Sequence, residues 1–248
     1  MTSSPADPAI LPSGRLSRAF TRLFMKRARV AAAERVAEGF RLITLESPEF
    51  RGARWAPGQK VQIAIGSAFV ARTFTPMDWD ADAGRTHILG YAHAGGGPGS
   101  AWLDRAAPGD PCDVFGPRAS LDVSRAAGMC VVIGDETSIG LACALARWRP
   151  AGSPAACLLE VDRLADVRAV LARLDLHAGE LFQRTTGDAH LDDVERRLPE
   201  LAASGATFVL TGKASSIQRL RRALKGLGVP SSRLATKPYW VPGKTGLD

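Results

Sequence analysis

The hydrophobic pattern of this chain changes near residue 122, and this change constrains the fold more than any other feature. Before it, residues 35–47, 60–65, 86–93 and 112–116 are short β-rich stretches, with Pro–Gly turns at 57–58 and 108–109. After it, apolar stretches at 129–134, 155–161, 180–184 and 207–212 alternate with helical patterns at 138–148, 164–174 and 215–228. We therefore expect an antiparallel β-barrel over residues 30–121 and an α/β domain with a parallel sheet over residues 122–248.

The first 29 residues form a third segment, which we expect to be flexible and basic. The opening is rich in Pro and Ser, and much of the net charge of +7 follows it between positions 15 and 29. This stretch could be an amphipathic basic helix that seeks a membrane or nucleic acid, but we prefer a solvated lead-in to the first strand. We expect no nucleic-acid partner, because no reader fold accompanies the charge. No apolar run is long enough to cross a bilayer.

The cysteines argue against a metal site. No C-x-x-C pair occurs, so neither zinc nor an iron–sulfur cluster has a local signature, and we expect no metal. Most of the cysteines sit in apolar segments as core thiols, which fits a reducing, cytoplasmic setting. The four are Cys112, Cys130, Cys143 and Cys157.

The tail of the chain contains a false phosphate-loop signal. Residues 242–246 read PGKTG, but the first glycine of a G-x-x-x-x-G-K-[ST] loop would fall on Pro238. Only three residues follow Thr245, so no helix can receive a phosphate. The aromatic pair Tyr239 and Trp240 therefore needs another explanation, either as part of a ligand site or as a final strand that packs in the core.

Residues 71–80 carry the most informative chemistry of the first half. Arg72 offers a cation, Phe74 an aromatic face and Thr75 a hydroxyl. On a strand, Arg72 and Phe74 share one side while Thr73 and Thr75 share the other. A flavin dinucleotide requires groups of these three kinds. The alternative is an ordinary strand end with a core phenylalanine.

A glycine-rich stretch at residues 93–102 provides a second candidate contact. His93 precedes four glycines, and Ser100 and Trp102 end the stretch. Glycine lets backbone N–H groups approach a phosphate closely, and a serine hydroxyl can add a contact. The alternative is a flexible hairpin. It is not a dinucleotide-binding fingerprint, because it follows barrel strands and lacks the G-x-G-x-x-G spacing.

Residues 130–145 predict a strand, a turn and a helix in immediate succession. Thr137 or Ser138 can cap the helix, whose positive end can hold a phosphate or a nucleotide. Asp135 and Glu136 would repel phosphate, and they serve equally well as caps or ribose ligands. The turn follows the first strand of the sheet at its carboxyl end, where such folds bind ligands.

The order R-x-[YF]-T, H-x-x-x-G-P-x-S-x-W, G-D-E-T and Y-W-x-x-G resembles the siderophore-interacting proteins over residues 30–244. These are FAD-dependent ferric-siderophore reductases related to the ferredoxin–NADP reductases. The resemblance implies a flavin-binding barrel followed by a nicotinamide-binding-like domain. It also implies that electrons pass from NADH, NADPH or a ferredoxin-like donor to a ferric siderophore, which releases iron as Fe(II).

The resemblance also assigns roles to residues. Arg72 would hold the FAD pyrophosphate, Phe74 would lie against the flavin, and Thr75 would bond near its reactive N5 atom. The stretch that begins at His93 would form the second FAD contact, the acidic turn would line the cleft between domains, and the aromatic tail would wall the flavin. The expected cofactor-binding residues are Arg72, Thr73, Phe74, Thr75, His93, Gly97, Pro98, Ser100, Trp102, Asp135, Glu136, Thr137, Tyr239 and Trp240.

The chain departs from the family in ways that bear on the donor. Phe74 stands where the family usually has Tyr, and Lys213 where it often has Glu, while Asp162 leans toward NADH. We hypothesise that a set of four basic residues captures an anionic siderophore. We expect the protein to be a monomer. Two alternatives remain open, namely a general NAD(P)H:flavin or ferredoxin-type oxidoreductase and a non-catalytic siderophore-binding protein. The basic set is Lys60, Arg118, Lys237 and Lys244.

Overall fold

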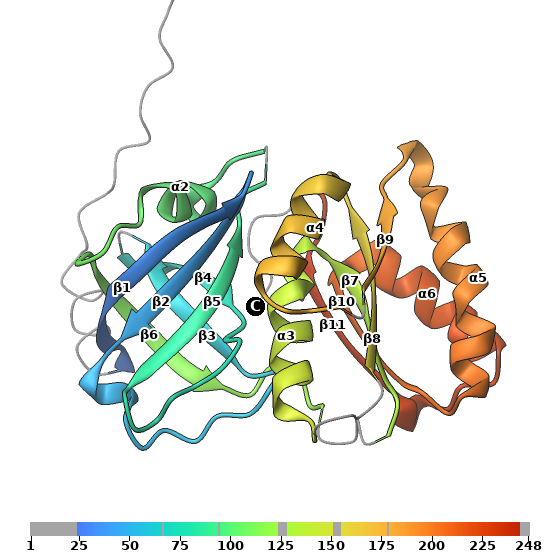
Figure 1. Cartoon of the computed structure of the whole chain (residues 1–248), viewed down its shortest axis with the longest axis horizontal. Coiled ribbons are helices and arrows are strands. Elements are labelled where there is room, and N and C mark those ends of the chain that lie inside the picture. The colour runs from blue at the N-terminus through green and yellow to red at the C-terminus, as the bar shows by residue number, and fades with distance from the viewer. Residues whose placement is uncertain are drawn as a thin grey trace, which may run out of the picture.

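The chain forms two sheet domains that lie side by side (Figure 1). The computed structural model describes residues 24–65, 67–93, 95–123, 128–150, 155–177 and 179–243, without the side chains of residues 67–69. The two sheets belong to the two halves of the sequence, and the change of pattern near residue 122 separates them.

The N-terminal sheet is antiparallel throughout, in the order β4-β3-β6-β1-β2-β5. Its edges approach each other, since Pro76, just after β4, makes an isolated bridge to Ile88 of β5. The sheet therefore curves into a barrel. Its strands are β1 (Lys26–Ala37), β2 (Phe40–Glu46), β3 (Lys60–Ile65), β4 (Ser67–Phe74), β5 (Arg85–Tyr91) and β6 (Pro111–Arg118).

The barrel core follows from strict alternation along the strands. Ile43 and Leu45 of β2 and Ile88 of β5 are fully buried between partly exposed neighbours. The same rule explains why β1 begins at Lys26, ahead of the boundary that we placed at residue 30. Ala28 and Val30 already point inward there. Residues 1–23, which hold most of the expected basic segment, lie outside the described residues.

The second sheet is parallel, in the order β11-β10-β7-β8-β9. All six residues of β7 are buried, as expected for a strand that helices cover on both faces. The strands are β7 (Cys130–Asp135), β8 (Ala155–Val161), β9 (Gly179–Gln183), β10 (Thr207–Lys213) and β11 (Leu234–Trp240). The helices are α3 (Ile139–Trp148), α4 (Leu164–Arg173), α5 (His190–Ala203) and α6 (Ala214–Gly226).

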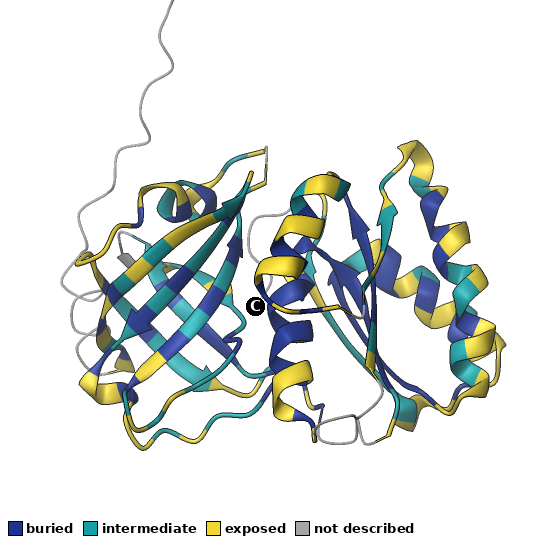
Figure 2. Ribbon diagram, viewed as in Figure 1, coloured by how far each residue is buried: buried dark blue, intermediate teal, exposed yellow. Residues whose placement is uncertain are grey.

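The helices divide between the two faces of the parallel sheet (Figure 1). Helices α3 and α4 lie toward the barrel, and their apolar residues share a core cluster with Phe40 and Met77 of the barrel. Helices α5 and α6 cover the other face with a separate cluster. In Figure 2 the buried residues, in dark blue, lie on the strands of the parallel sheet and on the helix faces that pack against it, and the exposed residues, in yellow, lie on the outer faces of the helices. The two domains therefore meet through a continuous apolar core.

The expected fold class is confirmed, with two helices that we did not anticipate. Helix α2 (Pro98–Arg105) begins inside the glycine-rich stretch, and α5 fills the segment between β9 and β10. Pro98 occupies the first turn of α2, where the missing N–H costs nothing. Among the helices within the described ranges, none has the length and apolarity needed to cross a membrane.

Gly90 of β5 provides a test of how α2 is held on the barrel. A Cβ atom at Gly90 would lie 2.1 Å from Cδ2 of Leu103, which is buried and anchors α2. We expect Gly90→Ala to lower the free energy of unfolding by about 1–3 kcal/mol through overpacking, measured by urea denaturation. Gly226→Ala is the matched control, because nothing lies within 4 Å of a Cβ there. An equal loss in both variants would contradict this packing.

Candidate functional site

The glycine-rich stretch leads into the N-terminus of α2. Gly97 precedes the helix with a φ of 120°, a conformation that favours glycine, and it offers no side chain to cap the first amides. His93, Gly97 and Ser100 line a cleft of about 330 Å³. Ser100 is buried, whereas His93 is exposed. Arg35 and the carboxylates of Glu38 and Asp104 also line the cleft, so the uncapped helix end is the part of it that suits an anionic group.

Strand β4 presents Arg72 and Phe74 to the same helix, as the alternation predicts. A Cβ atom at Gly99 would lie 3.2 Å from Cγ of Arg72, so the lack of a side chain lets α2 start directly against the arginine. The ring of Phe74 lies 5.6 Å from that of Trp102 of α2. Thr73 is exposed on the opposite side. Arg72, Phe74 and Trp102 therefore gather at one helix, with the aliphatic part of Arg72 against its first turn and Nη1 of Arg72 donating to the backbone carbonyl of Ala71 at 2.8 Å.

Thr75 connects the barrel to the C-terminal tail. Its Oγ1 atom donates a hydrogen bond to the hydroxyl oxygen of Tyr239 at 3.4 Å. Tyr239 and Trp240 are half-buried residues of β11, so the tail is a strand of the parallel sheet. Burial raises the pKa of Tyr239 to about 12, which keeps its hydroxyl protonated. Tyr239 and Trp240 can thus belong to the final strand and also form part of a ligand site, so the two interpretations of the tail are compatible.

The acidic turn after β7 is buried. Asp135 has no exposed surface, and one of its oxygens accepts hydrogen bonds from the backbone N–H and the hydroxyl of Thr137. The other oxygen accepts the indole N–H of Trp240 at 2.7 Å. Burial raises the pKa of Asp135, and the bonds from Thr137 and Trp240 oppose that effect. Only Thr137 of this turn is exposed.

Glu136 belongs to an ion-pair network that centres on Arg184 and is buried except at Asp162, which is exposed. The guanidinium lies 2.8 Å from Glu136 and 2.8 Å from Asp162, with Asp135 and Glu160 each at 3.9 Å. Burial raises the pKa of Glu136, an effect that Arg184 opposes. Burial alone would lower the pKa of Arg184, but the carboxylates outweigh it and leave a net rise. The carboxyl edge of the sheet is therefore acidic around one arginine.

Further pairs occupy this edge of the sheet. His190 Nε2 lies 2.8 Å from Glu160, and both side chains are buried. The Lys213 ammonium donates to Asp188 at 2.7 Å and lowers the pKa of that carboxyl. The Lys213 cation is therefore already paired with a carboxylate.

The residues expected to capture substrate fall into different environments. Lys60 is only 8% exposed, and the β3–β6 register pairs it with Arg118. Arg118 is exposed and donates to Gln62 at 3.0 Å. Lys237 is half-buried in β11, opposite Thr211 of β10. Lys244 lies outside the described residues. Of the four, Arg118 offers the most exposed cation among those described.

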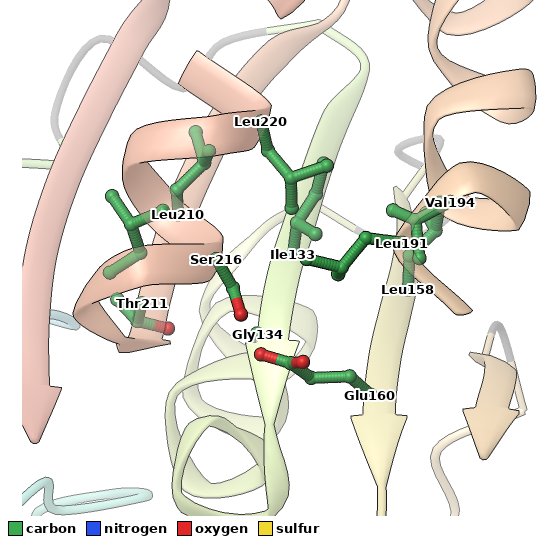
Figure 3. A pocket seen from close by; sticks show the side chains of 11 residues that line it. Ile133, Gly134, Leu158, Glu160, Leu191, Val194, Leu210, Thr211, Ser216 and Leu220 are labelled. Atoms are coloured by element: carbon green, nitrogen blue, oxygen red, sulfur yellow. The ribbon is translucent and has the colours of Figure 1, made fainter. Parts of the chain in front are cut away.

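A small cavity lies between the parallel sheet and helices α5 and α6 (Figure 3). The side chains of Ser216 and Glu160 turn toward each other beside Gly134. The cavity volume is about 10 Å³, which leaves room for one water molecule at most. The buried Ser216 hydroxyl has no partner among the described residues. This cavity cannot hold a nucleotide.

The sequence did not single out Arg184, Glu160 or Tyr91. Arg184 stood at the end of an expected strand, where a lone cation beside several carboxylates was the available signal. Tyr91 donates to Asp162 at 3.5 Å across the two domains. No group of three or more His, Cys, Asp and Glu residues in the described part of the chain could hold a metal ion.

Two family models match the chain. One, described as a siderophore-interacting FAD-binding domain, matches residues 66–121, and one described as a siderophore-interacting protein matches residues 127–243. Together they span the glycine-rich stretch, α2, the acidic turn and the aromatic tail. No curated protein matches the chain in sequence.

Solved structures share the two-domain fold. The siderophore-interacting protein SipS from Aeromonas hydrophila superposes with a TM-score of 0.73 at 23% identity, over 90% of this chain and 93% of its own. A siderophore utilization protein from T. fusca gives 0.68 at 21% identity, over 90% and 95%. A ferredoxin reductase in carbazole 1,9a-dioxygenase gives 0.71 at 18% identity, over 87% and 69%. The chain therefore shares its two-domain fold with these proteins.

Proposed function

The chain belongs to the siderophore-interacting protein family, and from this premise we propose that it is an FAD-dependent ferric-siderophore reductase. Electrons from NADH, NADPH or a ferredoxin-like donor pass through the cofactor to Fe(III) in a siderophore, and iron leaves as Fe(II). The proposal includes a monomer with an FAD-binding domain over residues 30–121 and a nicotinamide-binding-like domain over residues 122–248.

The observation that carries the proposal is the meeting of Arg72 with the N-terminus of α2. A diphosphate needs positive charge and free backbone N–H donors, and this corner offers both. Gly97 and Gly99 keep side chains out of the approach, and Ser100 adds a buried hydroxyl beside the cleft. These residues fit an FAD pyrophosphate, and they lie within the segment that matches the FAD-binding domain.

The flavin ring would lie against Phe74, with Thr75 and Tyr239 at its edge. Phe74 supplies an aromatic face, and the Thr75 hydroxyl supplies a hydrogen bond. FAD held here would supply the redox chemistry, with a hydride from NADH or NADPH or single electrons from a ferredoxin-like donor on one side and single electrons to iron on the other, while the protein orients and shields it. The departure from Tyr at position 74 keeps the ring and removes one hydroxyl.

Reduction accounts for iron release without a protein acid, base or nucleophile. Fe(III) is a hard ion that the oxygen ligands of siderophores prefer, and the larger, less charged Fe(II) binds them less tightly. The chain's own task is then to hold an anionic chelate near the flavin. A cytoplasmic location is part of the proposal, and the four buried free cysteines support a reducing compartment.

The catalytic proposal is tested by turnover. The FAD-loaded protein is supplied with NADH and either a ferric hydroxamate or ferric catecholate siderophore, and Fe(II) is trapped by a coloured chelator. A higher kcat/KM for siderophores than for ferricyanide or free flavin supports a ferric-siderophore reductase. Turnover of the artificial acceptors alone would instead indicate a general oxidoreductase, and binding without turnover would indicate a carrier.

Substrate capture yields a separate prediction. Arg118→Glu combined with Lys237→Glu should raise the KM for an anionic ferric chelate about tenfold, because two attractions become repulsions. FAD affinity should not change. The control combines Arg221→Glu with Arg222→Glu on α6, an equal change of charge on the face away from the barrel. Equal KM values in the two double variants would reject a role for Arg118 and Lys237.

A further inference from the structure

A bulge in β11 sends its two aromatic residues to different domains. The register pairs Pro238 with Gly212 and Trp240 with Lys213 of β10, so Tyr239 is an extra residue without a partner. Such bulges re-aim side chains. The Tyr239 hydroxyl reaches Thr75 of the barrel as well as Thr211 of β10, while Trp240 reaches Asp135 at the end of β7.

The Asp135 carboxylate is fully engaged by the chain itself. One oxygen accepts both donors of Thr137, and the other accepts the Trp240 indole N–H at 2.7 Å. The side chain has no exposed surface through which to reach a ligand. The acidic turn therefore anchors the tail, and Asp135 does not present its oxygens to the cleft.

The surrounding residues make room for this anchor. A Cβ atom at Gly212 would lie 2.3 Å from an Asp135 oxygen, and Gly212 also has a φ of 95°, which favours glycine. The Arg184 guanidinium lies 5.9 Å from the centre of the Trp240 ring. The indole is thus bonded at its N–H and approached at its face by a cation.

We propose that Asp135 is a positioning residue: it fixes the indole of Trp240 and thereby holds Tyr239 of the bulge against Thr75. In this arrangement Asp135 determines where the aromatic side chains of the tail lie relative to the flavin, without touching the cofactor. The inference rests on the proposed function for its consequence at the flavin, but the anchor itself is a property of the chain.

The anchor is tested first on the full chain without FAD, by amide hydrogen exchange resolved by NMR. Asp135→Asn and Trp240→Phe should each speed exchange at Tyr239, Trp240 and Val241 about tenfold, because one hydrogen bond is weakened or lost. The combined variant should exchange no faster than either single variant, since both changes break one bond.

Trp148→Phe is the matched control, because Trp148 is an exposed tryptophan at the end of α3. It should leave the exchange rates of the tail unchanged. Trp240→Phe keeps an aromatic ring and is expected to fold even where Asp135→Asn does not. Wild-type exchange rates at Tyr239 and Val241 in Trp240→Phe would overturn the anchor.

The second stage adds FAD. Both variants should retain FAD affinity, because the residues proposed to hold the pyrophosphate lie on β4 and α2. Their bound flavin should be less quenched than in the wild type, because the aromatic tail is displaced from the ring. Wild-type quenching in variants with loosened tails would overturn the positioning role. Failure of the wild-type chain to bind FAD would contradict the proposed function, and the exchange rates would still decide whether Asp135 anchors the tail.

Discussion

Replacement of Arg72 by alanine should weaken FAD binding about 10- to 100-fold, the loss expected when a charge-assisted hydrogen bond to a phosphate disappears. Arg72 is half-buried, its aliphatic part packs against the start of α2, and its Nη1 atom donates to the backbone carbonyl of Ala71 at 2.8 Å, so the side chain is held in place before any ligand arrives. Quenching of FAD fluorescence during titration with protein gives the dissociation constant directly.

Arg85→Ala is the matched control for this variant. Arg85 lies on β5 of the same barrel, is largely exposed and pairs only with Glu46 among the contacts of the described residues. Its removal lowers the net charge equally but should leave FAD affinity unchanged. If the two variants lose FAD affinity to the same degree, only the overall charge of the barrel affects binding, and Arg72 at the start of α2 does not hold the pyrophosphate.

Arg184→Met should lower the free energy of unfolding by about 3–5 kcal/mol, as observed when one partner of a buried ion pair is removed. The arginine neutralises Glu136, which is 3% exposed, and lies within 4 Å of three further carboxylates. Without it, these acids face one another at the carboxyl edge of the sheet with no cation between them. Urea denaturation at neutral pH measures the loss.

Two further variants sharpen this prediction. Arg197→Met, which breaks an exposed pair with Glu180, should leave stability nearly unchanged. Glu136→Gln should restore part of the stability in the Arg184→Met background, because it removes one of the stranded charges. A loss in Arg184→Met no larger than that in Arg197→Met would show that the network does not stabilise the fold.

The fold could be predicted from local patterns, because strand alternation and helical periodicity are written in consecutive residues. The expected stretches account for β2, β3, β5 and β6 of the barrel and for β7 to β10 of the parallel sheet, whereas most of β1 and all of β4 and β11 lie outside them. Helix α2 was missed because Gly97, Pro98 and Gly99 signal a turn, although proline is well suited to a first helical turn. Helix α5 carries Pro199 within its length, which weakened its helical signal.

The site was harder to predict, because its members meet only in three dimensions. Arg72 and Phe74 share a face by strand geometry, and that much was visible in the sequence. The sequence could not show that Asp135 and Glu136 turn inward, since a carboxylate after a strand looks the same whether it binds a ligand or an arginine. Arg184 lies 48 residues after Glu136, and no local pattern links them.

The most direct measurement is an anaerobic visible spectrum of the purified protein after FAD is added and excess FAD is removed by desalting. Our account predicts a flavin band that survives desalting, bleaches when NADH or a reduced ferredoxin-like protein is added, and returns when a ferric siderophore follows. A colourless protein after desalting would contradict the account, as would a reduced flavin that the ferric siderophore fails to reoxidise.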